Sequence, residues 1–315
     1  MHSDARCARG PFKDVDLLLA RQLRGHSTAQ NRVPGRSRSD QRPLSTHQLL
    51  DAFEVLYETE GLSTYRLPFD LERVYGGIGF ASEVLYSNFV SSIDGVVALG
   101  EGKHAGSLIS GKYPADRFLM ALLRACADGV LLGAGTLRST PGHLWSPAQV
   151  YPSLAESFAG LRRSLGREPE PRLIVLTAHG DIDSAHPAIQ RGATVITTDA
   201  GKRALAEKLP STCEVVSLGK GEHVDVAKAV EEARKRGLAV LLSEGGPHLI
   251  GRLMEANLLD QAFITISPLV AGRDKQERLG MVEGVELQPL PGTWSKLLSA
   301  RRHGDYMFLR YGVKR

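Results

Sequence analysis

Short apolar runs and amphipathic stretches alternate along most of the chain. Apolar runs of about four to eight residues that end at glycine or polar residues indicate buried strands, whereas apolar residues spaced three and four apart indicate helices. The strands predicted on this basis are residues 84–90, 129–132, 173–177, 193–197, 214–218, 238–242 and 261–267.

Helices are predicted between these strands. One begins at Pro114, a residue that suits the first turn of a helix. Its apolar face carries Phe118, Leu119, Leu122, Leu123 and Cys126. Further helices are predicted over residues 185–190, 202–209, 224–235 and 247–256.

The elements predicted at the two ends of the chain depart from the alternation of strands and helices between them. Residues 45–48 (Ser-Thr-His-Gln) resemble a capping box, and the apolar residues that follow have helical spacing, so a helix is expected there. These apolar residues are Leu49, Leu50, Phe53, Leu56 and Tyr57. After residue 267 the helices stop, and residues 285–290 and 306–311 are expected to be strands that close the sheet.

The alternation of strands and helices predicts an α/β fold. We expect a mostly parallel sheet with helices on both faces and antiparallel C-terminal strands. Residues 81–315 should form one domain, preceded by a helical or irregular lead-in over residues 44–80. Ligands bind sheets of this kind at the carboxyl ends of the strands, so candidate chemistry is sought there.

The basic charge of the chain comes from its first 43 residues. This segment holds nine Lys and Arg against four acidic residues, whereas the rest holds 30 basic and 31 acidic residues. The segment lacks sustained periodicity and is expected to be a disordered tail. A targeting peptide, a nucleic-acid-binding arm and a start codon assigned too far upstream are alternatives. The body has no basic face, so no nucleic-acid partner is expected.

Composition excludes several other classes. No apolar run approaches the roughly 18 residues of a membrane-spanning helix, so no membrane partner is expected. Cys7, Cys126 and Cys213 are widely spaced and form no disulfide framework or metal pattern. The ten histidines show no ligand spacing either, so no metal is expected. A reducing cytoplasm suits this composition.

Two predicted strands end in glycine-rich turns that lead into helices. Gly133, Ala134, Gly135 and Thr136 follow residues 129–132, and Glu244, Gly245, Gly246 and Pro247 follow residues 238–242. Glycines let the backbone approach a phosphate closely, and free N–H groups can donate to it. Each turn alone is more often plain turn chemistry, but the pair favours a dinucleotide. The complete GxGxxG fingerprint is absent, so an ordinary Rossmann site is not expected.

The end of strand 173–177 bears on the choice of cofactor. NAD sites usually place an acid there to bind the ribose 2′-hydroxyl. This chain has Thr177 and His179, which suit a 2′-phosphate better, although Asp181 lies close behind. The pattern leans toward NADPH.

A third group of polar residues follows strand 84–90. Asn88, Ser92 and Asp94 have even spacing and would point to one side, where they could bind a polar ring. The alternative is an Asx turn in which Asp94 and Gly95 reverse the chain. Asp94 and Glu244 are the carboxyl groups best placed to transfer a proton at strand ends. Glu244 could equally be an anchor that accepts hydrogen bonds from a ring.

Five ordered segments together resemble the reductase domain of the riboflavin-pathway deaminase/reductase proteins, which has a dihydrofolate-reductase-like fold. They are Asn88-Phe-Val-Ser-Ser-Ile-Asp-Gly95, the stretch from Arg124 to Thr136, Pro171-Arg-Leu-Ile-Val-Leu176, Ser243-Glu-Gly-Gly-Pro-His-Leu249 and the stretch from Leu259 to Gly272. The deaminase motifs H-x-E and P-C-x-x-C are absent, so a stand-alone pyrimidine reductase is implied.

The resemblance implies that NADPH reduces 5-amino-6-(5-phosphoribosylamino)uracil to its ribitylamino form, by hydride transfer to C1′ of the open imine. It implies a homodimer as well. The cofactor contacts it implies are Val90, Gly133, Gly135, Thr136, Thr177, Gly245, Gly246, His248 and Leu249. The substrate contacts it implies are Asn88, Ser92, Arg117, Arg124 and Leu144, with Asp94 and Glu244 as catalytic groups.

Two observations leave the substrate open. Arg117 and Arg124, either of which would bind the substrate phosphate, lie on the helix face opposite Phe118 and Leu122, where a solvated face is the alternative. Residues 138–143 replace a turn in which relatives usually carry an acid. A reductase for a pterin such as dihydrofolate, and a regulatory protein that binds nucleotide without turnover, are the rival hypotheses.

Overall fold

The computed structural model describes residues 50–100, 105–273, 278–288 and 293–313. All of these lie in one compact unit, His47–Arg315. The tail predicted over residues 1–43 and the capping box at residues 45–48 lie outside the described residues.

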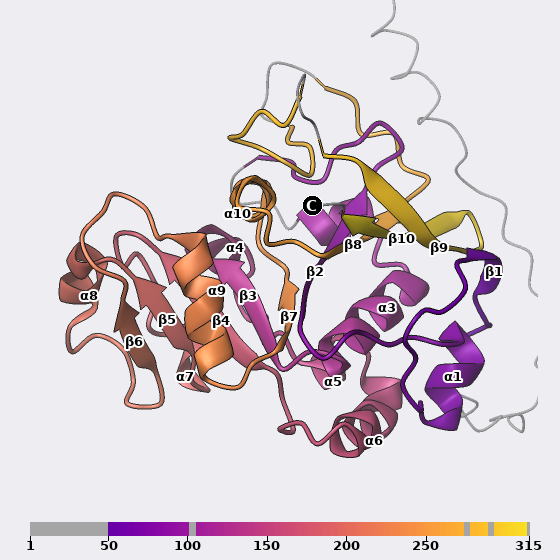
Figure 1. Ribbon diagram of the computed structural model, residues 1–315, viewed down its shortest axis with the longest axis horizontal. Coiled ribbons are helices and arrows are strands. Elements are labelled where there is room, and N and C mark those ends of the chain that lie inside the picture. Colours follow the sequence, from indigo (N-terminus) through magenta and orange to yellow (C-terminus); the bar gives the residue numbers. More distant parts are fainter. Residues whose placement is uncertain (1–49, 101–104, 274–277, 289–292, 314–315) are drawn as a thin grey trace, which may run out of the picture. The chain divides into compact units, whose positions relative to one another are not determined.

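A mixed sheet forms the centre of the described unit (Figure 1). Its strands are β1 (Glu54–Glu58), β2 (Val84–Ser91), β3 (Gly129–Gly133), β4 (Arg172–Thr177), β5 (Thr194–Thr197), β6 (Glu214–Ser217), β7 (Val240–Ser243), β8 (Gln261–Ile266), β9 (Ser295–His303) and β10 (Tyr306–Val313). Their order is β1-β9-β10-β8-β2-β7-β3-β4-β5-β6. The strands from β8 to β6 are parallel, whereas β10, β9 and β1 add to β8 in antiparallel fashion. The predicted fold class is confirmed.

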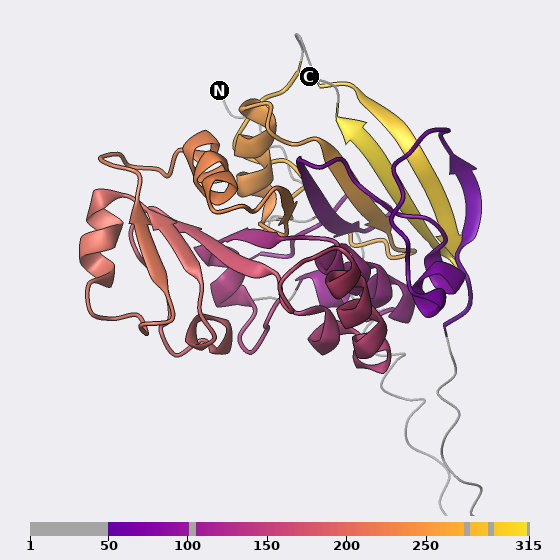
Figure 2. The same cartoon turned by 60° about the horizontal axis from the view of Figure 1, so that its bottom comes forward.

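Helices cover both faces of this sheet (Figure 2). They are α1 (Phe69–Tyr75), α2 (Ala105–Ile109), α3 (Pro114–Ala125), α4 (Ala134–Ser139), α5 (Pro147–Val150), α6 (Ala155–Ser164), α7 (Pro187–Gln190), α8 (Asp199–Leu205), α9 (Val226–Lys235) and α10 (Pro247–Glu255), with a short 3-10 helix at Pro152–Leu154. Each helix predicted from residue 114 onward is present.

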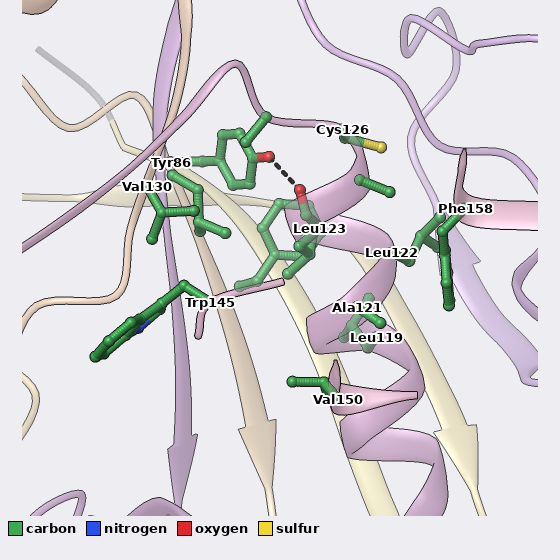
Figure 3. Packing of buried hydrophobic residues seen from close by; sticks show 14 of the residues in the cluster. Tyr86, Leu119, Ala121, Leu122, Leu123, Cys126, Val130, Trp145, Val150 and Phe158 are labelled. Carbon is green, nitrogen blue, oxygen red and sulfur yellow. Dashed lines mark hydrogen bonds between the residues drawn. The ribbon is translucent and has the colours of Figure 1, made fainter. Parts of the chain in front are cut away.

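Alternate residues of the strands divide the core into two parts. Val84 and Tyr86 of β2 pack with α1, α3 and α6 on one face, whereas Leu85 packs with α9 and α10 on the other. The predicted apolar face of α3 is buried against the first of these parts (Figure 3). There the Tyr86 hydroxyl donates to the Leu123 carbonyl oxygen at 2.7 Å, so this phenol is both buried and satisfied.

The helix predicted around Leu49–Tyr57 is wrong. Residues 54–58 form strand β1, which pairs with β9 at the edge of the sheet. Phe53 joins an aromatic group with Tyr75 and Phe308, at ring-centroid distances of 5.3 and 4.7 Å. Pairing with a distant strand overrides the helical spacing of this short segment.

The strand predicted over residues 285–290 is also wrong. No strand is present in its described part, residues 285–288, and the antiparallel strand is β9. Val285 packs instead against α10, since a Cβ added to Gly251 would lie 3.2 Å from its side chain. The sequence that follows contains Pro289 and Pro291, which have no N–H to give to a ladder, so it suits a strand poorly.

Candidate active site

The two glycine-rich turns lie next to each other at one edge of the sheet. β3 and β7 are parallel neighbours, and the ladder continues one residue further, where the Glu244 N–H donates to the Leu131 carbonyl oxygen at 3.0 Å. A Cβ on Gly246 would lie 3.8 Å from Thr136 Oγ1, so the turns are in contact. The structure thus brings together the pair that the sequence selected as a dinucleotide site.

A cavity of about 290 Å³ opens beside these turns. Four of the predicted cofactor residues line it: Gly133, Thr177, His248 and Leu249. A Cβ added to Gly133 would meet no protein atom within 4 Å, so the space over this glycine is open to a ligand. Arg252 and Glu283 also line the cavity. Apolar walls with a few charged groups fit a nucleotide.

Gly245 and Thr177 also make contacts within the protein itself. A Cβ on Gly245 would lie 2.4 Å from Leu249 Cδ2, so the absence of a side chain there lets the start of α10 pack against its own turn. Thr177 Oγ1 accepts a hydrogen bond from the Gly180 N–H at 3.1 Å, which leaves its proton and one lone pair for a ligand. His179 is exposed and does not line the cavity.

Asp94 connects two loops. Its carboxylate accepts hydrogen bonds from Ser92 Oγ at 2.6 Å and from the Ala271 and Gly272 N–H groups at 3.0 and 2.8 Å. The bond from Ser92 is the first of several that lower the pKa of Asp94 to about 2. Gly95 has φ +82° and its N–H donates to the Ser92 carbonyl oxygen, so the chain reverses here as the alternative expected. The Asp94 side chain does not close an Asx turn, since the Val96 N–H donates to Ser92 Oγ instead.

The other residues of this segment differ in their surroundings. Ser92 is buried, and its hydroxyl is engaged by Asp94 and by the Val96 N–H. Val90 packs against Val96, Leu99 and Ile109 beneath α2, away from the cavity lining. Asn88 is half-buried, and its side chain has no hydrogen-bond partner among the described residues. Unlike Ser92 and Asp94, it therefore has polar atoms available to a ligand.

Arg124 is almost fully buried and binds Glu244. Its Nε and Nη2 donate to the two carboxylate oxygens at 2.9 and 2.5 Å, while Nη2 also lies 2.8 Å from His143 Nε2. Because a guanidinium can only donate, that His143 nitrogen accepts. The solvated-face alternative is therefore wrong for Arg124, whose side chain is 2% exposed. His143 stands in the turn that departs from the family pattern.

Arg117 lies elsewhere. It is exposed, its Nε donates to the Val150 carbonyl oxygen at 3.1 Å, and it lines a second cavity of about 660 Å³ together with Lys112 and Tyr151. Leu144 is half-buried against the core, and its N–H donates to Gln149 Oε1 at 2.7 Å.

No helix in the described ranges is long and apolar enough to cross a membrane. Within the same ranges, no three His, Cys, Asp or Glu side chains form a group that could hold a metal ion.

Comparison with known proteins decides the family. The model of the RibD C-terminal domain family matches residues 83–303. The chain belongs to this family. The resemblance seen in the five sequence segments is thereby confirmed.

Three known proteins are similar to the chain in sequence or in fold. A 2,5-diamino-6-ribosylamino-4(3H)-pyrimidinone 5′-phosphate reductase of Aquifex aeolicus is 25% identical over 195 residues, which are 61% of this chain and 80% of the relative. A pyrimidine reductase-like protein of Corynebacterium diphtheriae has a TM-score of 0.60 at 20% identity, over 78% of this chain and 98% of the other. A deaminase/5-amino-6-(5-phosphoribosylamino)uracil reductase of Thermotoga maritima has a TM-score of 0.52 at 18% identity, over 73% of this chain and 56% of the other. The solved structures share the fold.

Sequence reasoning missed three groups at the site. Arg252 follows His248 by one helical turn, and this i, i+4 spacing could have indicated a shared face with it. His143 has no local signal in the sequence, and only the folded chain brings it to Arg124. Asp116 is 4% exposed in the first turn of α3, where a sequence position suggests only an ordinary surface acid.

Proposed function

We propose that the protein is an NADPH-dependent reductase of a ribosylaminopyrimidine 5′-phosphate. Membership of the RibD C-terminal domain family supports the reaction class. The observation that carries the proposal for this chain is the cavity beside the paired glycine turns, where Gly133, Thr177 and Leu249 meet Arg252.

The cavity suits a phosphorylated dinucleotide in its charge as well as its position. Its apolar wall includes Leu176, Val224 and Leu249, which fit the flat face of an adenine. Arg252 has no hydrogen-bond partner or ion pair among the described residues, so its donors are available to the 2′-phosphate. NADPH, when bound, supplies the hydride.

The pyrimidine would lie over the α3 face of the neighbouring strands. Ser87 pairs with Ser243 in the β2–β7 ladder, so Asn88 and Glu244 follow side by side. An amide and a carboxylate offer donors and acceptors to the amino and carbonyl groups of the ring. Arg124 holds the Glu244 carboxylate in place, which favours the anchoring role of Glu244 over proton transfer.

The substrate phosphate is assigned to Arg117 rather than Arg124. The Arg124 guanidinium is taken up largely by Glu244, whereas Arg117 keeps both Nη groups for an anion beside Lys112. Two cations at an open cavity suit a phosphate monoester dianion.

We also propose a cytoplasmic homodimer. Its proposed substrates are phosphorylated metabolites, and among the described residues β1 pairs with a strand on one side only, with Val55, Leu56 and Tyr57 exposed. An exposed apolar edge strand is a ready site for pairing between copies. Light scattering of the full chain would test it, and a strictly monomeric protein at micromolar concentration would contradict it.

The function is tested by following NADPH oxidation with three candidate substrates in parallel. These are the 2,5-diaminopyrimidinone ribosylamine phosphate, the 5-aminouracil ribosylamine phosphate and dihydrofolate. Turnover with either ribosylamine and none with dihydrofolate supports the proposal and identifies the pyrimidine. Turnover with dihydrofolate alone would establish the pterin alternative, and NADPH binding without any turnover would establish the regulatory one.

A further inference from the structure

Two of the carboxyl groups at this end of the sheet already have donors on their oxygens. Asp94 accepts three hydrogen bonds from Ser92, Ala271 and Gly272, which lower its pKa. Glu244 accepts two from the buried Arg124. The oxygens of both carboxyl groups are thus taken up by other residues of the protein. The reduction of an imine nevertheless requires a proton at nitrogen.

Asp116 is a third carboxyl group on the same face. Strand β2 places Asn88 on the α3 side, and the β2–β8 ladder pairs Val90 with Thr265 on that same side. The hydroxyls of Thr265 and Ser110 lie beside the Asp116 carboxyl. Thr265 Oγ1 is fully buried and has no hydrogen bond of good geometry. Asp116 therefore lies at the carboxyl ends of β2 and β8, two residues past Asn88 along β2 and within electrostatic reach of Glu244.

The surroundings of Asp116 contain little to hold a negative charge. The side chain is 4% exposed and forms no ion pair with any described residue. Glu244 repels a negative charge on it, Arg117 attracts one only weakly, and Tyr306 of β10 is the remaining titratable neighbour. Burial is the main cause that raises the pKa of Asp116 to about 6, and the two hydroxyls offset only part of it.

A purely structural role explains this placement poorly. An acidic residue in the first turn of a helix stabilises it through the helix dipole, but only modestly. A buried carboxyl without a cation costs stability, and such groups gather at functional sites. We propose that Asp116 is the acid that protonates the substrate nitrogen during reduction, an inference that rests on the proposed function.

The proton and electron balance of this step is as follows. Hydride from C4 of the reduced nicotinamide forms a C–H bond at C1′, and the π pair of the C=N bond moves to nitrogen. Asp116 gives its proton to that nitrogen, so an N–H bond forms as the nicotinamide is oxidised. The resulting Asp116 carboxylate regains a proton from water. A bound pyrimidine removes further water from Asp116, which favours its protonated form.

Three variants of the full chain test the proposal. Asp116→Asn keeps the shape of the side chain without an ionisable proton, and Asp116→Glu keeps the acid. Asp70→Asn is the matched control, because Asp70 is a first-turn acid of α1 whose carboxylate accepts a hydrogen bond from Ser157. For each, kcat and KM are measured from pH 5 to 9, NADPH affinity by fluorescence, and the carboxyl titration by infrared difference spectroscopy against Asp116→Asn.

We expect kcat of the wild type to fall as pH rises through the pKa of Asp116, because the acid must be protonated to act. Asp116→Asn should lose about 100-fold or more in kcat and this pH dependence, with NADPH affinity unchanged. Asp116→Glu should recover part of the rate, and Asp70→Asn should match the wild type. An Asp116→Asn enzyme that keeps turnover within about threefold of wild type, or the same pH profile, would overturn the proposal.

The infrared titration separates this inference from the proposed function. If the wild type reduces none of the candidate substrates, the proposed function fails and the proton-transfer role fails with it. If the wild type turns over but the Asp116 carboxyl titrates near the ordinary range for aspartate, only the present inference fails. Titration near 6, shifted upward when the reduced ribitylaminopyrimidine phosphate binds, is the result expected.

Discussion

The guanidinium of Arg124 holds the carboxylate of Glu244 through Nε at 2.9 Å and Nη2 at 2.5 Å, across 120 residues of sequence. The pair joins the last turn of α3 to the turn after β7. That turn supplies both Glu244 and Gly246, the glycine that faces Thr136. One ion pair therefore links the geometry of the substrate side to that of the cofactor side.

Breaking this pair from one side should be costly. Arg124→Met leaves a carboxylate that is only 10% exposed without its partner, and we expect a loss of about 3–5 kcal/mol in the free energy of unfolding. Arg124→Met combined with Glu244→Met should recover most of that loss. Urea unfolding of the single and double variants measures the coupling. Strictly additive effects would show that the pair does not act as a unit.

Removing the Arg252 charge should affect one cofactor and not the other. We expect Arg252→Gln to weaken NADPH binding by about 10-fold to 100-fold and to leave NADH binding unchanged, because only NADPH carries the 2′-phosphate. Titrations with 2′,5′-ADP and 5′-AMP would report on the same subsite. Lys228→Gln is the control, since Lys228 lies near Val226 on α9 but pairs with Asp225 outside the cavity lining. An equal loss of affinity for NADPH and NADH would show that Arg252 does not bind the 2′-phosphate.

Arg117 is expected to recognise the substrate phosphate. Arg117→Gln should raise KM for the phosphorylated ribosylamine by about 10-fold or more, because a charge-assisted hydrogen bond is lost. It should leave KM unchanged for the dephosphorylated compound. Steady-state kinetics with the two compounds distinguish this from a general defect, which would raise both KM values.

Asp94 is expected to act as a loop anchor. Asp94→Asn replaces one of the two oxygens that accept from the Ala271 and Gly272 N–H groups by a donor, so turnover should fall while NADPH affinity stays near that of the wild type. The dependence of kcat on pH near 6 should persist, because the pKa of Asp94 is lowered to about 2 and the group stays ionised throughout. Loss of that pH dependence in Asp94→Asn would instead make Asp94 the proton donor.

Asp116 should also leave a signature in stability. Its pKa is raised in the folded protein from 3.8 to about 6, so the folded state holds the proton more tightly than the unfolded state. The stabilising contribution is complete below pH 4 and is lost as pH rises through 6, by about 3 kcal/mol in all. The free energy of unfolding of Asp116→Asn, relative to that of the wild type, should therefore increase as pH rises from 4 to 8. Chemical unfolding at the two pH values measures this difference, which Asp70→Asn should not show.

Much of the parallel part of the sheet could be predicted because its signals are local. The apolar runs of β3 and β7 end at glycines, and Pro114 begins α3 as expected. The neighbouring positions of the two glycine turns followed from these strands. Strand β1 could not be predicted, because its conformation depends on pairing with β9, which is more than 200 residues away in sequence.

The chemistry of individual side chains was harder to predict than their positions. Asp94 is a candidate proton donor from its place at a strand end, but it is bound by the nearby Ser92 hydroxyl and by backbone N–H groups of the distant residues 271 and 272. Arg124 shows the same limit, since its partner Glu244 and its neighbour His143 come from separate segments. Asp116 gives no local signal, because its burial depends on Thr265 of β8.

The central claim, hydride transfer to a ribosylaminopyrimidine phosphate, is tested most directly by isotope transfer. The full chain would be incubated with NADPH that is deuterated at both C4 positions and with each ribosylamine phosphate, and the product examined by mass spectrometry and NMR. The account predicts a ribitylamino product that carries deuterium at C1′ and nowhere else. A reduced product without deuterium at C1′, or oxidation of the cofactor without a ribitylamino product, would contradict it.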